Sequence, residues 1–309
     1  YDDLGTGFER NDFSLKTSYD LNGEYRQRLT LKLGYADEQS NETYVGLTKA
    51  DFDADPYRRY AASALDNMQW EHTQLQLTHT FEPSITSSVT TDIYRNEFSR
   101  DWFKLNSFGT GSSVTIDEVL QNPEGNNSDY YQILTGERNT GAPFEALLIG
   151  NNGRDFVSQG IQTKLNADVF VFGLSHQLEV GVRLHMDEIK RNHTQQSYDM
   201  TATGLQTSVG SSLETTRINK GEATALALYI KDDIQLNDST ISVGLRSETI
   251  ETTLTDTTTP TTTIKESTEN VLVPGAGIYT QVTESFGLLA GVHKGYVATA
   301  PGQEGDIDP

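Results

Sequence analysis

Residues 24–37 read EYRQRLTLKLGYAD, and their side chains alternate between two kinds. One set is mostly apolar and has a tyrosine at each end: Tyr25, Gln27, Leu29, Leu31, Leu33 and Tyr35. The other set is largely polar and basic: Arg26, Arg28, Thr30, Lys32, Gly34 and Ala36. A period of two is the signature of a β-strand with two different faces. The stretch therefore predicts a strand that is apolar on one face and polar on the other.

The same alternation recurs later in the chain. In residues 175–190, His176, Leu178, Val180, Val182, Leu184 and Met186 oppose Gln177, Glu179, Gly181, Arg183, His185 and Asp187. In residues 156–170, an apolar set around Ile161 and Leu165 opposes Gln162, Lys164 and Asp168. The pattern predicts about ten strands, at 8–20, 24–37, 69–81, 85–98, 156–170, 175–190, 222–236, 240–251, 271–282 and 286–297. Their length of about 12 to 16 residues exceeds the five or six that are usual in globular sheets.

Short and long connections alternate strictly between these strands. The short ones hold turn-forming residues, at 21–23, 82–84, 172–173, 237–239 and 283–285. The long ones are 38–68, 99–155, 191–221 and 252–270. An antiparallel meander therefore gathers the short turns at one end and the long loops at the other. Outer-membrane barrels have this asymmetry.

We therefore predict an all-β fold, a transmembrane antiparallel up-and-down β-barrel. In such a barrel the apolar face meets hydrocarbon and the polar face lines a wet lumen. We expect an outward-facing apolar set, namely Leu29, Leu31, Leu33, Leu178, Val180, Val182 and Leu184. We expect a lumen-facing set, namely Arg26, Arg28, Lys32, Glu179 and Arg183. Two aromatic girdles are expected, with Tyr25, Phe81 and Phe286 near the short turns and Tyr35, Trp70 and Trp102 near the loops.

Two segments fit this pattern less well. In 222–236, Asp232 shares the parity of Leu226, Leu228 and Ile230. Either a bulge shifts the register there, or Asp232 lies at the periplasmic interface. In 271–282, Pro274 and several small residues interrupt the apolar set.

Composition excludes several classes of function. The 44 acidic residues outnumber the 23 basic ones and give a net charge of −21, which repels phosphate backbones, so we expect no nucleic-acid partner. The absence of cysteine excludes disulfide scaffolds, thiolate metal sites and thiol nucleophiles. No apolar run approaches the roughly 20 residues of a membrane-spanning helix.

Signals of catalysis are weak, and we expect no enzyme, no cofactor and no metal site. The six histidines include no His-Glu-x-x-His motif, and His72 and His79 fall on opposite faces of one strand. Residues 51–55, DFDAD, begin like a calcium loop, but Pro56 replaces the glycine and Ala62 the bidentate glutamate. Solvated loop acids are the alternative interpretation of this stretch.

Several stretches resemble TonB-dependent outer-membrane receptors of the ferric-dicitrate (siderophore) type. The most specific is NETYVGLT at 41–48, followed by ADF at 50–52, DPYRRYAAS at 55–63 and MQWEHTQ at 68–74. Further stretches are TTDIYRN at 90–96, RDWFKL at 100–105, PGAG at 274–277, and GVHKGY at 291–296 leading into Pro301-Gly302.

The resemblance implies a 22-stranded barrel of the Gram-negative outer membrane, plugged by an N-terminal domain. It implies import of a ferric chelate, ferric citrate or another siderophore, with iron present only as the bound chelate. Its partners would be the TonB energy-coupling complex, reached through the plug, and outer-membrane lipid with lipopolysaccharide. By the same resemblance, residues 1–309 are expected to be a partial barrel domain without the plug and the terminal strands. The chain begins at Tyr1 without an initiator methionine and stops at Asp306–Pro309 in polar sequence, so the ends also lead us to expect a fragment or processed piece.

An anionic ferric chelate needs local cations, and guanidinium groups suit bidentate carboxylate binding. The candidate ligand-binding residues lie in the long connections: Tyr57, Arg58, Arg59, Tyr60, Arg100, Trp102 and Lys104, with Arg138 and Arg154 as further loop cations. Pairing of these arginines with nearby acids or with lipopolysaccharide is the alternative. Arg26, Arg28 and Lys32 are expected to contact the plug.

Two other classes of function remain open from the sequence. A passive porin shares the alternation and the loop asymmetry but has no plug. A soluble β-rich polysaccharide-binding or polysaccharide-degrading protein, if a glycosidase, needs a carboxylate pair about 5 to 10 Å apart and no detergent.

Overall fold

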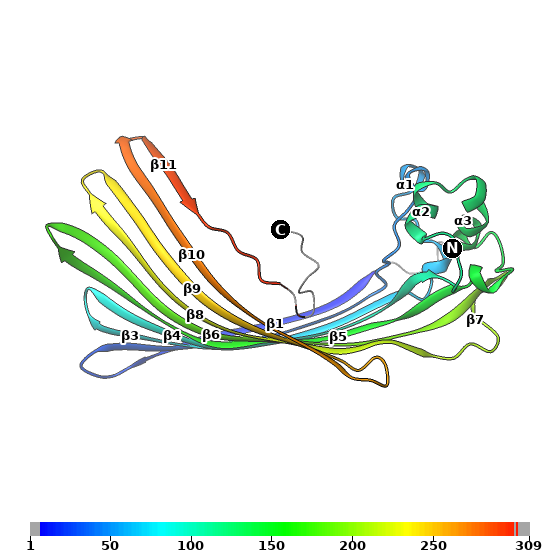
Figure 1. Ribbon diagram of the computed structural model, residues 1–309, viewed down its shortest axis with the longest axis horizontal. Helices are drawn as coiled ribbons and strands as arrows, with labels where there is room; N and C mark the ends of the chain where they lie inside the picture. The colour runs from blue at the N-terminus through cyan, green and yellow to red at the C-terminus, as the bar shows by residue number, and fades with distance from the viewer. Residues whose placement is uncertain (1–6, 300, 302–309) are drawn as a thin grey trace.

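The computed structural model describes residues 7–299 and 301, and its main feature is a single antiparallel sheet (Figure 1). The strands are β1 Phe8–Leu21, β2 Arg26–Ser40, β3 Asn67–Ser84, β4 Ser87–Phe108, β5 Leu147–Val171, β6 Leu174–Thr201, β7 Gly204–Thr207, β8 Glu214–Leu236, β9 Ser239–Asp256, β10 Thr263–Thr283 and β11 Phe286–His293. They pair in chain order, except that β7 pairs only with β6 and β8 follows β6 in the sheet. The all-β, up-and-down prediction is confirmed.

All ten predicted strands are present, and most are longer than the alternation indicates. β5 and β6 are the longest, at 25 and 28 residues, because both continue into what the sequence shows as loop. β11 ends earlier than predicted, at His293, and the short β7 was not predicted. The long connections shrink to 41–66, 109–146, 202–213 and 257–262. The last of these is a tight connection, so the prediction of a long loop there is wrong.

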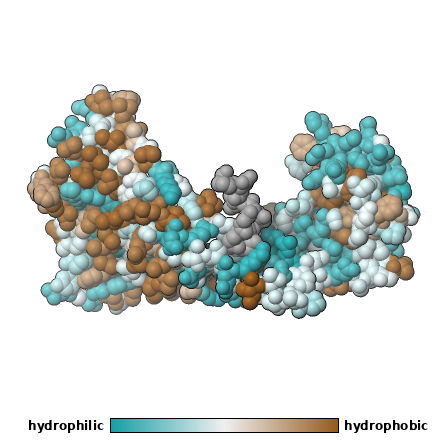
Figure 2. Space-filling view, in the orientation of Figure 1, coloured by the Kyte–Doolittle hydropathy of each residue, from teal (hydrophilic) through white to brown (hydrophobic). Residues whose placement is uncertain are grey.

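The register confirms that the sheet has two distinct faces. Leu31 lies opposite Leu77, and the row continues through Ile93 and Ile161 to Leu184 and Leu226. We call the side with this row the apolar face, and the side with Arg28, Lys32, Glu179 and Arg183 the polar face. On the apolar face Val182 is 41% exposed, whereas Ala227 and Ile250 on the polar face are 1% and 7% exposed. Apolar side chains gather over the half of the sheet that holds the short turns (Figure 2).

Register also corrects one expectation about aromatic residues. Trp70 lies opposite Glu38 and Arg100, so it shares the polar face with Lys32. Trp102 follows Arg100 with the same parity. Neither tryptophan therefore belongs to an outward girdle at the loop end. Near the short turns, Tyr25 and Phe81 do pack together, with ring centroids 5.7 Å apart.

Asp232 lies on the apolar face near the short turns. No register shift interrupts β8 there, so the bulge alternative is wrong. Asp232 Oδ2 lies 2.8 Å from His176 Nδ1 on the neighbouring strand. Asp232 is thus hydrogen-bonded to a neighbouring strand where β8 approaches its turn. β10 also passes through Pro274 without a break, and Pro274 lies opposite Leu245.

Glycines on the polar face let tyrosines lie across neighbouring strands. Tyr94 lies opposite Gly160, and Tyr229 lies opposite Gly181. A Cβ atom on Gly181 would lie 2.2 Å from Tyr229 Cε1. This arrangement corresponds to aromatic rescue of glycine in sheets.

Three short helices gather at the loop end of the sheet, opposite the short turns (Figure 1). They are α1 Lys49–Ala54, α2 Ile116–Gln121 and α3 Ser128–Thr135, accompanied by the 3-10 helices η1 Ala61–Ser63, η2 Gly125–Asn127 and η3 Pro143–Glu145. Thr115 and Glu118 form a capping box at α2, and Gly136, at φ 83°, ends α3. The main buried cluster lies here: Ala61, Ala62, Leu105, Phe108, Val119, Tyr130, Ile133, Leu134, Leu147, Ile149 and Met200.

The sheet is open, with β1 and β11 at its two edges. Within residues 7–299 no pairing joins these two strands, as predicted. No helix in this range is long and apolar enough to cross a membrane. The two chain ends and Gly302 lie outside the described residues.

Candidate ligand site

Three neighbouring strands each place one arginine at the same level of the polar face. Arg100 of β4 lies opposite Arg154 of β5, which lies opposite Arg191 of β6. We call these three residues the arginine row. Because adjacent strands lie about 4.8 Å apart, their backbones span about 10 Å. Arg191 Nη1 donates to Asn219 Oδ1 at 3.1 Å, and at the same level on β9 Asp256 lies opposite Asn219.

Several other cations of the sheet have an acidic partner at ion-pair distance. Arg246 Nε lies 3.0 Å from Glu248, and Lys231 Nζ lies 2.7 Å from Asp233. In the part of the chain that the structure describes, no guanidinium group of the arginine row forms an ion pair with a carboxylate. Arg100 Nε also has no hydrogen-bond partner there. Positive charge that is not compensated locally attracts anions.

One level nearer the loops, the polar face holds another cation. Asn152 lies opposite His193, and His193 lies opposite Arg217. Arg154 Nε donates to His193 Nε2 at 3.4 Å. A fourth guanidinium group therefore adjoins the arginine row.

Aromatic rings flank the arginine row on both sides. On the side nearer the short turns, the Phe98 and Phe156 rings lie 5.9 Å apart. Trp70 lies opposite Arg100 at the level of the row itself, and its ring is 5.8 Å from that of Phe98. On the loop side, the guanidinium carbon of Arg100 lies 5.5 Å from the Trp102 ring. Cations and rings together form a surface suited to an anion with an organic periphery.

Lys104 and Tyr44 complete this region. Lys104 Nζ lies 3.6 Å from the centroid of the Tyr44 ring and 5.8 Å from that of Trp102. The Tyr44 and Trp102 rings meet edge to face at 5.2 Å. The connection 41–66 thus touches the site through Tyr44.

The structure separates the remaining loop candidates from the arginine row. Tyr57 is 86% exposed, whereas Tyr60 is 2% exposed. Arg58 Nη1 lies 2.6 Å from Asp51 Oδ1. Arg59 is buried and donates from Nη2 to the backbone oxygen of Asp66 at 2.7 Å. The sequence grouped these residues with Arg100, Trp102 and Lys104; the structure brings together only the last three.

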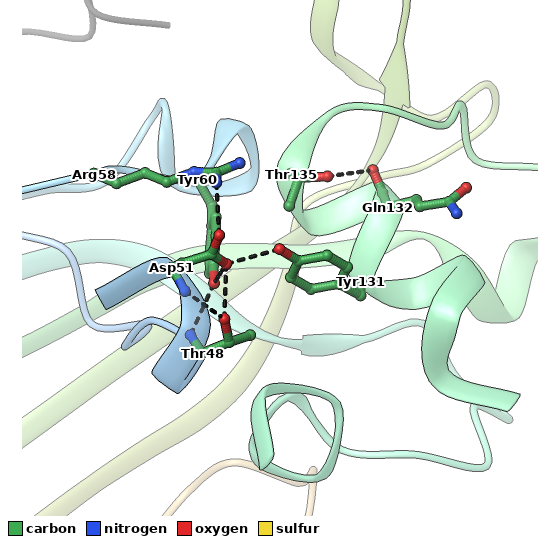
Figure 3. Close-up of polar contacts among 7 residues, drawn as sticks. All are labelled: Thr48, Asp51, Arg58, Tyr60, Tyr131, Gln132 and Thr135. Atoms are coloured by element: carbon green, nitrogen blue, oxygen red, sulfur yellow. Dashed lines mark hydrogen bonds and ion pairs between the residues drawn. The ribbon is translucent and has the colours of Figure 1, made fainter. Parts of the chain in front are cut away.

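Asp51 is the centre of the polar contacts around Arg58 (Figure 3). Its carboxylate accepts from Tyr60 Oη at 2.6 Å, from Tyr131 Oη at 2.7 Å and from Thr48 Oγ1 at 2.8 Å. Burial opposes ionisation, but these three hydroxyl groups and the charge of Arg58 outweigh it and hold the pKa of Asp51 below its ordinary value. Burial, followed by the bond to Asp51, raises the pKa of Tyr131 to about 12. Asp51 is thus neither a solvated loop acid nor the first ligand of a calcium loop.

Asp66 is a second buried acid in this region. It is 1% exposed, and its Oδ1 accepts from the backbone N–H of Leu105 at 3.1 Å. Burial raises its pKa to about 6, against the opposing effects of its hydrogen bonds and of Arg59. The carboxyl group links the end of the connection 41–66 to β4.

The residues expected to face the lumen all lie on the polar face. Arg26 pairs with Glu82 at 3.3 Å, Arg28 with Asp20 at 2.7 Å, and Glu179 with Lys164 at 3.4 Å. Arg183 Nε donates to Tyr94 Oη at 3.0 Å, and Lys32 lies opposite Lys16. Their orientation toward a lumen stays a prediction.

Sequence reasoning missed Arg191, His193 and Arg217. All three fall in 191–221, which the sequence shows as a loop, so the face of the sheet on which they lie could not be predicted. Had β6 been extended at period two beyond Lys190, Arg191 and His193 would have continued the set of Glu179 and Arg183. Asp51 and Asp66 gave no signal that they would be buried.

The geometry defines an open wall of a transmembrane barrel with an apolar outer side and a cationic site at its loop end. The family described as TonB dependent receptor-like, beta-barrel, matches residues 14–306. The chain belongs to this family. Its members reside in the outer membrane of Gram-negative bacteria, and so does this protein. A search of curated protein sequences found no match.

Solved structures agree on the fold. The chain is similar to the unliganded ferric citrate transporter FecA, with a TM-score of 0.65 and 20% identity over 93% of this chain and 36% of that one. It is similar to the ferric-catecholate import receptor Fiu from E. coli K12 in its closed form, with a TM-score of 0.62 and 12% identity over 93% of this chain and 43% of that one. It is also similar to the siderophore receptor PiuA from Acinetobacter baumannii, with a TM-score of 0.63 and 12% identity over 90% of this chain and 40% of that one. The chain thus spans less than half the length of each of these structures.

Proposed function

We propose that this chain forms part of the wall of a TonB-dependent receptor that imports an anionic ferric chelate across the outer membrane. The observation that carries the proposal is the arginine row, three guanidinium groups at one level without acidic partners. The neighbouring FecA, Fiu and PiuA structures, whose names refer to ferric citrate, ferric catecholate and siderophores, support this class of cargo.

The chemistry of the arginine row favours carboxylate-bearing ligands. Guanidinium offers paired N–H donors that match a carboxylate, and charge-assisted hydrogen bonds are stronger than neutral ones. Three such groups across about 10 Å suit a ligand with several carboxylates, such as ferric citrate. Iron enters this scheme only as cargo, within the chelate.

The rest of the receptor enters the proposal through the polar face. When the apolar face lies toward lipid and lipopolysaccharide, the polar face lines the lumen. The residues that then face the lumen are Arg26, Arg28, Lys32, Glu179 and Arg183. There they would meet a plug domain, through which the TonB complex supplies energy. Family membership supports this receptor over the passive porin and over a soluble polysaccharide-binding protein.

Affinity measurements in the full-length receptor test the site. Replacing Arg154 and Arg191 together by alanine should weaken ferric citrate binding at least about tenfold, because each charged hydrogen bond contributes about 1.5–3 kcal/mol. Arg246→Ala is the matched control, since Arg246 lies on the same face but is paired with Glu248. A cationic ferric hydroxamate should bind no more weakly to the double variant. Undiminished affinity for ferric citrate in that variant would show that the arginine row does not bind the ligand.

The same assay ranks the loop arginines. The sequence predicts that Arg58→Ala with Arg59→Ala weakens binding more than loss of Arg138 or Arg154. The pairing of Arg58 with Asp51 and the burial of Arg59 instead favour a larger loss for Arg154→Ala than for the Arg58 and Arg59 double variant. Arg138 is paired with Glu145 at 3.0 Å, so its loss should have little effect.

A further inference from the structure

His193 of β6 lies among four arginines at the loop end of the polar face. On one side it contacts Arg154 of β5, and on the other it lies opposite Arg217 of β8. Arg191 precedes it by two residues on its own strand, and Arg100 lies opposite Arg154. His193 is only 7% exposed. A buried imidazole thus lies inside the region that supplies positive charge to the candidate ligand site.

The β6 backbone is irregular at this residue. The β6–β8 register shifts between His193 and Thr194, and a bulge of this kind, often found beside functional sites, redirects a side chain. Thr216 Oγ1 of β8 donates to the backbone oxygen of His193 at 3.2 Å and anchors the irregular segment. The preceding residues of the opposite face, Lys190 and Asn192, are polar. The segment therefore lies beyond the apolar band that crosses the membrane.

The contact with Arg154 determines where the imidazole carries its proton. Arg154 Nε is only a donor, because a guanidinium group keeps its proton at all relevant pH values. Since it donates to His193 Nε2 at 3.4 Å, Nε2 must accept, and the ring is neutral with its proton on Nδ1. Burial, followed by the charges of Arg154, Arg217, Arg191 and Arg100, lowers the pKa of His193 to about 4. The pKa thus agrees with the geometry.

A neutral acceptor holds an arginine without cancelling its charge. Arg246 is held instead by the carboxylate of Glu248 at 3.0 Å, so that pair has no net charge left for an anion. In the part of the chain that the structure describes, the two terminal nitrogens of Arg154 form no hydrogen bond or ion pair. They remain available for a ligand carboxylate, whose bidentate binding requires a fixed guanidinium plane.

We propose that His193 is a positioning residue, whose neutral imidazole orients the guanidinium group of Arg154 toward the ligand and leaves its full charge in place. The positioning of Arg154 stands on contacts within the chain. Its benefit for binding an anionic chelate rests on the proposed function.

Three substitutions at His193, made in the full-length receptor, separate orientation from charge. His193→Gln keeps an acceptor for Arg154, so affinity for ferric citrate should stay within about twofold of wild type, whereas His193→Leu removes it and should weaken binding about tenfold. His193→Glu should weaken binding at least as much, because its carboxylate pairs with Arg154 and cancels its charge. His79→Leu makes the same change on the apolar face and should have no effect. Equal losses in His193→Gln and His193→Leu would overturn the proposal.

A double-mutant cycle shows whether His193 acts through Arg154. In receptor that already carries Arg154→Ala, adding His193→Leu should change the affinity by less than about twofold, because the group to be oriented is gone. An undiminished loss in that background would mean that His193 acts independently of Arg154, and it would refute the positioning role.

Arginine modification tests the same contact without ligand. Phenylglyoxal reacts with guanidinium groups, and mass spectrometry of peptides locates its adducts. Arg154 should react at least about threefold faster in His193→Leu than in wild type, because its hydrogen bond is lost, and His193→Gln should restore the wild-type rate. Arg246 is the internal control, since its partner Glu248 is unchanged.

The two kinds of measurement distinguish this inference from the proposed function. Equal modification of Arg154 in wild type and His193→Leu would show that His193 does not hold this arginine. If wild-type receptor does not bind ferric citrate, the choice of cargo fails, while the modification rates still decide whether His193 positions Arg154.

Discussion

Asp66, the buried acid beside Arg59, should titrate within an accessible pH range. Its pKa is raised by burial from 3.8 to about 6, so the folded loop end holds the proton more tightly than the locally unfolded chain. As pH rises from about 4 to 6, the unfolded chain ionises first and the folded loop end loses stability. The full loss is on the order of 3 kcal/mol, since one pKa unit corresponds to about 1.4 kcal/mol. Protection factors of residues 63–67, corrected for intrinsic exchange, should fall between pH 4.5 and pH 7.5 in wild type and stay level in Asp66→Asn.

Asp51 serves as a control because its pKa shifts in the opposite direction to that of Asp66. Its pKa is lowered, so its contribution is fully present above the ordinary value of 3.8 and is lost only as pH falls through its folded pKa. Between pH 4.5 and 7.5 it should add no slope. A pH dependence that persists in Asp66→Asn would assign the titration to another group.

At the scale of strands, the alternation could be read only where one face is apolar. Leu29, Leu31 and Leu33 set the parity of β2 correctly, as did Val180 and Val182 for β6. Beyond Asp187 both faces are mostly polar, and beyond Ser99 apolar and polar side chains no longer alternate, so the period-two signal disappears although the strands continue. Strand ends and the loops 99–155, 191–221 and 252–270 were therefore misplaced.

The candidate site depends on those unreadable strand ends. Arg100 and Arg154 were named as loop cations, but their position opposite each other follows from the β4–β5 register. Arg191 joins them through the β5–β6 register. Cross-strand neighbours separated by tens of residues cannot be inferred until every strand length is known.

The crossing of Tyr94 over Gly160 should make that glycine difficult to replace. A Cβ atom at Gly160 would lie 2.5 Å from the backbone oxygen of Leu184 and 2.6 Å from Tyr94 Oη. Gly160→Ala should lower the unfolding free energy of the full-length receptor by about 1–3 kcal/mol through overpacking. Gly244→Ala, whose nearest contact would be an ordinary 3.6 Å, should change it by less than about 0.5 kcal/mol. Thermal unfolding in detergent measures both, and equal stabilities would show that β5 and β6 can separate freely there.

For the whole molecule, the open sheet determines how residues 1–309 behave when expressed alone. β1 and β11 each leave one edge of backbone N–H and C=O groups unpaired in the described sheet, which a membrane does not tolerate and which in water favours aggregation. The apolar face adds exposed side chains such as Leu226 at 48% and Leu228 at 55%. The isolated chain should therefore be insoluble or require detergent, and it should form no ion-conducting pore in planar bilayers.

Preparations of the isolated chain renatured in detergent are compared with the full-length receptor by heat-modifiable gel mobility, which reports barrel closure. Discrete conductance steps from the isolated chain, or a closed species that resists heat, would mean that β1 and β11 pair with each other and form a small barrel.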